Sequence, residues 1–418
     1  MKTVSVIGLG NRGTEYMMFI HRLHRKKMKI IAVCDIRKQA LDDIAPKYAI
    51  PKDRQFLSTD EFFANGVISD ALIITTQDAS HFQITKDAIN TGYKIILLEK
   101  PVSGNYDECL ELHTLAREKG VKLLVCHVLR YSNYFGKIKE IIRSGALGDL
   151  ITINHTENVG YFHFAHSFVR GNWNKEEEST PSILAKCCHD LDLIQWYANS
   201  KAKTVSSVGG LYYFNKQHAP EGAAPGCLDD CKVKDSCPYN AENLYIKDPF
   251  WKAKFVKYMR RTLTGKTKSS KADIYEALRN GDYGKCVFLN DNNVCDSQIV
   301  HIGFENGINA VLTMNAFSNK MFRQLHIIGT KGELIGYGTS LKLAVFGKPT
   351  KKVRIKGLKV GGHIEGDMRL IKSFVKLVNG EKVNDSDLTT IEATLPSHEI
   401  AKRAEESRKA TLGGEQNN

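Results

Sequence analysis

The sequence predicts an α/β protein with two domains: a doubly wound N-terminal domain with a parallel sheet, then a C-terminal α/β domain with an open, mostly antiparallel sheet. As far as residue 128, short apolar runs alternate with helical patterns, which is typical of parallel strands covered on both faces. From about residue 150, strand patterns follow one another with few helices between them. The 418 residues are enough for two cores.

The first domain, residues 1–128, is expected to contain strands at 4–7, 30–34, 71–75, 95–98 and 123–126. Helical patterns lie between them at 12–26, 38–48, 80–91 and 106–119. Gly92 and Gly120 stand at the ends of two of these helices, where a left-handed residue is common. This order predicts a sheet that binds ligands at the carboxyl ends of its strands.

The second domain, residues 129–412, is expected to contain strands at 151–159, 204–214, 298–305, 308–317, 323–329 and 333–337. Asn306-Gly307 between two of them is a strong hairpin signal. Helices at 181–197, 367–378 and 398–410 would cover one face of this sheet. An insertion at about 215–295 is rich in Gly, Pro, Cys and Lys, and we expect it to have little core of its own.

The chain starts directly with a strand pattern and has no apolar run of the ~18 residues that a membrane span needs. We therefore expect a cytoplasmic protein without a membrane partner. Much of the net charge of +13 comes from the stretch between Trp251 and Ala272, which holds eight Lys and Arg residues and no acid. Apolar residues interleave there at helical spacing, so we interpret it as an amphipathic helix with a solvated basic face and expect no nucleic-acid partner. An RNA-binding or membrane-surface strip, or a basic mouth for an anionic substrate, are the alternatives.

A glycine-rich turn follows the first strand and opens the first helix. Its residues are Gly8, Gly10, Asn11, Arg12 and Gly13. In a Rossmann dinucleotide-binding domain such glycines allow a tight turn, a close approach to the pyrophosphate and close helix–strand packing. Asp35, at the end of the second strand, would accept hydrogen bonds from the ribose and favours NAD. Arg37 would suit a 2′-phosphate, so NADP stays open.

Further motifs occur along the chain in a characteristic order. They are Thr75, Thr76, Gln77 and His81 around the end of the fourth strand, Glu99-Lys100-Pro101 after the fifth, Cys188-His189-Asp190-Leu191-Asp192-Leu193, and Gly329-Thr330-Lys331-Gly332-Glu333. With these motifs the chain resembles, over nearly its whole length, the Gfo/Idh/MocA family of glucose–fructose oxidoreductase and inositol dehydrogenase-like enzymes. The resemblance implies hydride exchange at a secondary hydroxyl or ketone of a sugar or cyclitol. It also implies a homodimer or homotetramer, and a cofactor site that includes Thr75, Thr76, Gln77, His81, Glu99 and Lys100.

The same resemblance places Lys100 between nicotinamide and substrate and makes His189 the acid/base. A histidine with a pKa near neutrality suits removal of a hydroxyl proton. The family often has an aspartate four residues before this histidine, where this chain has Ala185. We therefore expect Lys186 to join Lys100 and His189 as a third catalytic residue, with one lysine pKa depressed by the neighbouring cations.

The segment before this helix is rich in groups that bind hydroxyls or stack on sugar rings. Tyr161, His166, Arg170 and Trp173 are the expected substrate ligands, together with Lys100, Lys186 and His189. Arg170 and Trp173 are the best two candidates.

Three cysteines lie within eleven residues of the insertion, and a fourth follows downstream. They are Cys227, Cys231, Cys237 and Cys286. In a cytosolic protein this clustering indicates a structural zinc site, which would supply folding energy to a polar insertion. Reduced cysteines without a metal are the alternative.

The sequence therefore predicts an NAD(P)-dependent oxidoreductase that acts on a sugar, sugar derivative or cyclitol. The first alternative is a redox-neutral, NAD-dependent glycosidase or lyase that works through a transient keto-sugar, as some relatives of the family do. A non-catalytic, nucleotide-binding sensor is the second alternative, and the retained Glu99-Lys100-Pro101 and His189 argue against it.

Overall fold

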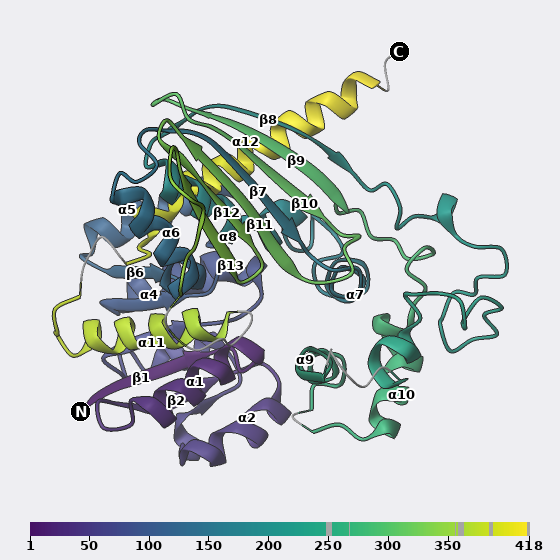
Figure 1. The fold of residues 1–418 in the computed structure, drawn as a ribbon. Coiled ribbons are helices and arrows are strands. Elements are labelled where there is room, and N and C mark those ends of the chain that lie inside the picture. The colour runs from purple at the N-terminus through teal and green to yellow at the C-terminus, as the bar shows by residue number, and fades with distance from the viewer. Residues whose placement is uncertain (248–252, 267, 356, 358–362, 384–387, 416–418) are drawn as a thin grey trace.

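The computed structural model describes residues 1–247, 253–266, 268–355, 357, 363–383 and 388–415. An N-terminal Rossmann domain lies below a large sheet, and the insertion lies to one side of both (Figure 1). The predicted fold class is confirmed, with a parallel sheet followed by a mostly antiparallel one. Across the described ranges, no helix is both long and apolar enough to span a membrane.

The N-terminal sheet is parallel, and its strands lie in the order β3-β2-β1-β4-β5-β6. Every residue of β4 is buried, and β5 and β6 are buried except at their first residues, as expected of strands covered on both faces. The strands are β1 (Lys2–Ile7), β2 (Met28–Cys34), β3 (Gln55–Phe56), β4 (Ala71–Ile74), β5 (Ile95–Leu98) and β6 (Lys122–Val125). The helices are α1 (Asn11–Leu23), α2 (Lys38–Ile44), α3 (Thr59–Ala64), α4 (His81–Thr91) and α5 (Tyr106–Glu118).

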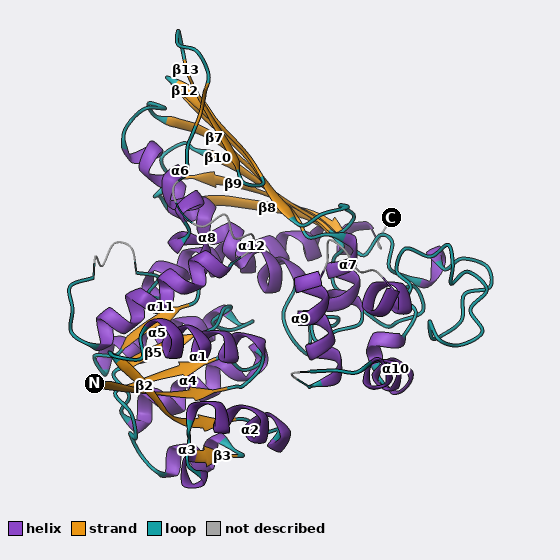
Figure 2. Cartoon of the chain, turned by 60° about the horizontal axis from the view of Figure 1, so that its bottom comes forward, coloured by secondary structure: helices purple, strands orange, loops and turns teal. Residues whose placement is uncertain are grey.

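The second sheet runs in the order β14-β13-β12-β11-β7-β10-β9-β8 and is antiparallel except where β7 pairs with β10. Helices α8 and α12 cover one face of it (Figure 2). Its strands are β7 (Leu150–Asn158), β8 (Ala202–Gly210), β9 (Ser297–Phe304), β10 (Asn309–Asn315), β11 (Phe322–Gly329), β12 (Gly332–Tyr337), β13 (Ser340–Val345) and β14 (Lys351–Lys352). The remaining helices are α6 (Asn133–Arg143), α7 (Tyr161–Phe164), α8 (Ser182–Ala198), α9 (Ala253–Thr264), α10 (Lys271–Asn280), α11 (Ile364–Val378) and α12 (Ile391–Glu415).

The C-terminal part of the chain returns to the N-terminal domain. Val125 at the end of β6 donates its N–H to the carbonyl of Thr389 at 2.7 Å. Helix α11 lies against α1, and α12 against α5 and β6. These contacts fix the orientation of the two domains and therefore the shape of the space between them.

The insertion has a hydrophobic core, contrary to the expectation from its polar composition. The core contains Leu244, Tyr245, Met259 and Ile274, all buried. They come from α9, α10 and the short helical segment Asn243–Lys247. Helical periodicity over a short, lysine-rich sequence is enough to give one apolar stripe per helix. Residues 251, 252 and 267 of the predicted basic helix lie outside the described residues.

Candidate active site

A cleft of about 2260 Å³ separates the two domains, and residues of the insertion also line it. Most of the predicted site residues meet there, although they come from both domains. The predicted residues that line the cleft are Gly8, Gly10, Asn11, Arg12, Asp35, Arg37, Thr75, Thr76, Gln77, Glu99, Lys100, His166, Trp173, Lys186 and His189. Gly13, His81, Tyr161 and Arg170 are not among its lining residues.

The glycine-rich turn connects β1 to α1, and its glycines have different surroundings. Gly8 has a φ of +91°, and a Cβ there would lie 2.6 Å from the carbonyl oxygen of Thr75. A Cβ on Gly13 would lie 2.0 Å from the carbonyl oxygen of Gly8. A Cβ on Gly10 would meet nothing within 4 Å. Gly8 and Gly13 thus permit close packing, whereas Gly10 leaves open backbone facing the cleft, as a bound pyrophosphate requires.

Asp35 follows β2 and is held at the edge of the cleft. Its carboxylate accepts hydrogen bonds from the N–H of Leu9 at 2.7 Å and of Arg37 at 2.9 Å, and the Arg37 guanidinium donates two more at 3.0 Å. Burial acts to raise the pKa of Asp35, but the Arg37 hydrogen bonds keep it below its ordinary value. The side chain of Arg37 remains 49% exposed, so it is free to turn toward a ligand.

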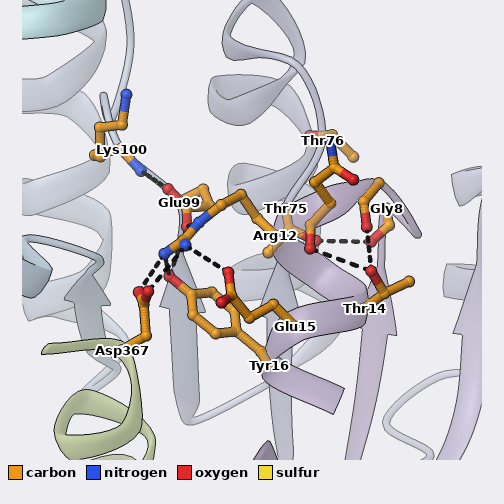
Figure 3. A network of polar contacts seen from close by, with 12 residues as sticks. Gly8, Arg12, Thr14, Glu15, Tyr16, Thr75, Thr76, Glu99, Lys100 and Asp367 are labelled. Carbon is orange, nitrogen blue, oxygen red and sulfur yellow. Dashed lines mark hydrogen bonds and ion pairs between the residues drawn. The ribbon is translucent and has the colours of Figure 1, made fainter. Parts of the chain in front are cut away.

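Arg12 lies at the centre of a network that joins the two domains (Figure 3). Its guanidinium donates to Glu99 at 2.8 Å, to Asp367 of α11 at 2.5 Å, and to the hydroxyl of Tyr16. Tyr16 also donates to Glu99 at 2.6 Å, and the second Glu99 oxygen accepts from the N–H of Lys100 at 3.0 Å. The charged groups of Arg12 and Glu99, predicted to bind the cofactor, are thus engaged in joining the domains and in fixing Lys100.

His81 also differs from the prediction, because it is fully buried behind the cleft. Its ring nitrogens lie 2.6 Å from the carbonyl oxygen of Pro101 and 3.2 Å from that of Thr76. The peptide between Lys100 and Pro101 is cis. His81 therefore holds together the two loops that follow β4 and β5 and does not face a ligand.

Lys100 follows β5 and donates a hydrogen bond from Nζ to the carbonyl oxygen of Ala185 in α8, at 2.9 Å. Burial acts to lower its pKa, but the fields of Cys188, Asp78 and Glu99 more than compensate, so the pKa of Lys100 is raised. The expected depression of one lysine pKa therefore does not fall on Lys100. Its charged ammonium group can stabilise negative charge on a substrate oxygen.

Lys186 pairs with a carboxylate that the sequence did not reveal. Its Nζ lies 3.2 Å from Oε1 of Glu157 in β7, and the second oxygen of Glu157 lies 3.0 Å from Nε of Arg323 in β11. The chain thus has no acid at position 185, but the buried carboxylate of Glu157 reaches the site from the sheet.

His189 is only 3% exposed and is surrounded by other imidazoles and by cations. Its ring centroid is 5.0 Å from that of His363 and 5.7 Å from that of His127, both edge to face. Burial lowers its pKa well below the usual range, and His363 and Lys100 lower it further. The imidazole is therefore neutral, whereas the sequence predicted a pKa near neutrality. Its Nδ1 is buried without a hydrogen-bond partner.

The two aspartates after His189 fix the helix that carries it. Asp190 accepts from Arg323 at 2.6 and 3.0 Å and contacts the ring of His155 at 2.6 Å. Asp192 accepts from Arg130 at 2.7 and 2.5 Å. Both aspartates are buried, so these charge-assisted bonds hold α8 against the sheet and against the segment that follows the first domain. His189 is thereby directed into the cleft.

Trp173 and His166 line the cleft from the segment before α8. The indole N–H of Trp173 donates to Asp78 at 2.8 Å, which connects this segment to the loop after β4. His166 is buried against Tyr283, with ring centroids 4.8 Å apart, and contacts the hydroxyl of Tyr245 at 2.9 Å. Burial and Arg170 lower the pKa of His166 to about 3, so this ring is also neutral.

Arg170, one of the two best substrate ligands by sequence, is directed away from the cleft. It is 2% exposed and donates to the carbonyl oxygens of Lys285 at 2.7 Å and Tyr239 at 2.9 Å. Tyr161 packs against the rings of Phe162 and Tyr239. The reason is that residues 161–169 are helical, not an open loop, so their side chains diverge around an axis. Arg170 and Tyr161 are accordingly removed from the set of substrate ligands.

The four cysteines of the predicted zinc site line one small cavity beside Arg170. The guanidinium of Arg170 donates to Sγ of Cys227 at 3.4 Å, and burial raises the pKa of Cys237. Within the part of the chain that the structure describes, no group of three or more His, Cys, Asp or Glu side chains is arranged to hold a metal ion. The structure therefore does not support the zinc prediction, and the apolar core of the insertion removes the energetic argument for it.

Several residues of the cleft carried no recognisable signal in the sequence. Glu157 and Arg323 lie in strands. The alternation of apolar and polar residues along these strands predicted only that one face of the sheet is buried. His363 precedes α11, nearly two hundred residues from His189. The cleft also contains Asp78, Arg261 and Asp367. Of these, Asp78 closes the motif Thr75-Thr76-Gln77-Asp78 that carries part of the family resemblance, but it was not selected as a site residue.

A glycine turn at the switch point of a parallel sheet, with a lysine of the same domain and a histidine of the other domain lining one cleft, is the arrangement of a two-domain, nucleotide-binding protein. Residues 2–127 match the family model described as oxidoreductase family, NAD-binding Rossmann fold, and residues 139–238 match the C-terminal alpha/beta domain of the same family. The chain belongs to the Gfo/Idh/MocA oxidoreductase family.

Relatives in this family have several recorded activities. The chain is 23% identical to 2,7-anhydro-N-acetylneuraminate hydratase of Escherichia coli over 50% of its own length and 53% of the relative. It is 32% identical to scyllo-inositol 2-dehydrogenase (NADP(+)) IolW of Bacillus subtilis, over 30% and 33% of the two chains. The chain spans a little more than half the length of three of the curated relatives that it matches.

Solved structures resemble the whole chain. The WlbA dehydrogenase of Bordetella pertussis, determined in complex with NADH and UDP-GlcNAcA, superposes with a TM-score of 0.65 and 14% identity, over 97% of this chain and 96% of that one. At this level of identity the similarity shows a shared fold.

Proposed function

We propose that the protein is an NAD(P)-dependent oxidoreductase that transfers a hydride between the nicotinamide and a secondary hydroxyl or ketone of a sugar, sugar derivative or cyclitol. One observation carries the proposal: Lys100 of the first domain and His189 of the second line the same cleft as the glycine-rich turn. Hydride transfer to or from an alcohol needs a cofactor cradle, a group that stabilises the oxygen and a proton carrier in one space.

The residues of the cleft fit a dinucleotide. The open backbone at Gly10 and the start of α1 would hold the pyrophosphate, and Asp35 would accept from the ribose of NAD. Arg37 could instead leave Asp35 and pair with the 2′-phosphate of NADP. When bound, the nicotinamide supplies the acceptor or donor of the hydride.

The end of the cleft that contains Lys100 and His189 is called the substrate end, and each residue there has a distinct role. The Lys100 ammonium donates a hydrogen bond to the reacting oxygen and stabilises its negative charge. The neutral imidazole of His189 takes the hydroxyl proton, because an uncharged ring still has a lone pair for it. Lys186, held by Glu157, binds a further substrate oxygen. Trp173 and His166 supply the ring surfaces on which a sugar packs.

A turnover assay tests the proposal. Purified protein is incubated with NAD or NADP and a panel of sugars, cyclitols and sugar derivatives, and absorbance of the reduced nicotinamide is followed. We expect net reduction with one substrate class, and a fall in kcat of about 10³-fold in Lys100→Ala, which removes an electrostatic contact made in the transition state. The exposed Lys257→Ala is the matched control and should keep full activity. If Lys100→Ala reduced the dinucleotide as fast as the wild-type protein, the role assigned to Lys100 would be refuted.

A second candidate is a redox-neutral glycosidase or lyase that forms a transient keto-sugar. The charged cluster of Lys186, Glu157 and Arg323 favours it, because elimination beside a ketone needs extra acid–base groups. A relative recorded as a hydratase agrees with this chemistry. Product release that depends on the dinucleotide, without net reduction of it, would replace the first candidate by the second.

The proposal includes a cytoplasmic homodimer or homotetramer. The face of the second sheet opposite α8 and α12 exposes Val208, Ile299, Ile335 and Tyr337, each at least 40% accessible. An apolar sheet face of this kind is suited to a second copy.

A further inference from the structure

The basic helix α9 of the insertion lies beside the glycine-rich turn of the Rossmann domain. In Figure 1 it lies between that domain and α10. The guanidinium of Arg261 donates to Oγ1 of Thr14 at 2.7 Å and to the carbonyl oxygen of Leu9 at 3.2 Å. One residue later, Oγ1 of Thr262 accepts from the side-chain amide of Asn11 at 3.0 Å. The helix thus contacts both the turn and the first turn of α1.

These contacts leave the charge of Arg261 unbalanced. Among the residues that the structure describes, Arg261 has no carboxylate within ion-pair distance, and its present acceptors are a hydroxyl and a carbonyl. Burial lowers its pKa, and the neighbouring Arg37 lowers it further, while Asp43 acts in the opposite direction. Asp35 is already bound to Arg37 and Leu9. Within the described residues, Arg261 donates only to neutral oxygens in this part of the cleft, which Asp43 also lines.

An anion placed there would give the Arg261 guanidinium a charged acceptor in place of neutral ones. Arg261, Arg37, Leu9 and Asn11 all line the cleft, so Arg261 borders the same space as the glycine-rich turn. A planar guanidinium binds a phosphate through two parallel hydrogen bonds, which are stronger than its present bonds to neutral oxygens.

We propose that Arg261 is a phosphate ligand of the dinucleotide, supplied by the insertion, and that α9 completes the cofactor site from outside the Rossmann domain. This rests on the proposed function, because it requires a dinucleotide in the cleft. The anion is either the pyrophosphate common to NAD and NADP or the 2′-phosphate of NADP, which lies near Arg37 and Asp35. The choice between NAD and NADP would then depend partly on helix α9, which lies outside the Rossmann domain.

Dissociation constants of NAD and NADP, measured by calorimetry without substrate, test this proposal. Arg261→Gln should raise the Kd of at least one dinucleotide by about tenfold or more, as expected for loss of a charge-assisted hydrogen bond. Lys257→Gln removes an exposed charge from the same helix and should change each Kd less than twofold. Arg261→Lys keeps the charge without the planar fork and should give an intermediate Kd. Thermal melting of each variant reports whether it is folded.

The pattern across the two dinucleotides identifies the phosphate. Equal weakening of NAD and NADP assigns Arg261 to the pyrophosphate, and weakening of NADP alone assigns it to the 2′-phosphate. A folded Arg261→Gln protein whose two Kd values match those of Lys257→Gln would overturn the inference and leave the proposed function intact. A wild-type protein that binds neither dinucleotide would overturn both.

Discussion

The two ends of the cleft are built in different ways. At the end proposed to bind the cofactor, here called the cofactor end, the turn from Gly8 to Gly13 exposes backbone to the cleft. The charged side chains of Arg12, Glu99 and Asp367 beside it pair with one another. At the substrate end, side chains from α8, β7 and β11 face the cleft, and neutral histidines stand among cations. Recognition by backbone can be encoded in six consecutive residues. Recognition by side chains depends on buried ion pairs between elements that are distant in sequence.

The buried ion pair of Asp190 offers the strongest test of this contrast. Asp190→Ala leaves His155 without its acceptor and Arg323 with Glu157 alone, and breaking a buried pair in this way costs roughly 3–5 kcal/mol of unfolding free energy. Denaturant unfolding measures that loss. Asp42→Ala, which removes an exposed pair with Lys38, is the control and should leave the unfolding free energy almost unchanged. A loss below about 1 kcal/mol for Asp190→Ala would show that the substrate end does not depend on this pair.

Gly10 and Gly13 of the turn allow a second comparison, within the cofactor end of the cleft. Gly13→Ala places a Cβ against the backbone of Gly8, so we expect it to destabilise the protein by about 1–3 kcal/mol. Gly10→Ala meets no atom of the protein and should leave stability unchanged. Its methyl group would occupy the approach of the pyrophosphate, so the Kd of NAD should rise about tenfold. Melting curves measure the loss of stability, and calorimetry measures the loss of NAD binding. A destabilised Gly10→Ala protein, or a Gly13→Ala protein of unchanged stability, would contradict the structure.

The smallest expected effect is a pH dependence at the cofactor end. Burial raises the pKa of Glu15 to about 7, with Arg12 opposing and Asp367 reinforcing the shift. A group whose pKa is higher in the folded state binds its proton more tightly there, so its contribution is complete below about pH 4.5 and is lost as the pH rises toward 7. We expect this loss to be roughly 1–2 kcal/mol, since solvent reaches 29% of the side chain. Glu15→Gln should flatten the stability profile between pH 5 and 7.5, and parallel profiles for the two proteins would contradict the shift.

Local patterns in the sequence predicted the fold class and the glycine-rich turn, because alternating apolar runs and a glycine spacing need no information from distant residues. Lys100 and His189 were placed in the cleft by the family resemblance, and Lys100 also by its position at the end of a strand. Even so, the sequence patterns missed β3, α3, α6, β13 and β14. The two-residue strands β3 and β14 leave no periodicity to detect.

The tertiary structure alone decided which side chains meet. Arg170 and Tyr161 belong to the same short segment as Trp173, yet a helical backbone turns them toward the insertion and away from the cleft. Glu157 reaches the cleft from a strand, and Arg261 reaches it from the insertion, 247 residues from its partner Thr14. The direction of a side chain depends on the packing of its whole element, and no spacing along the chain records that packing.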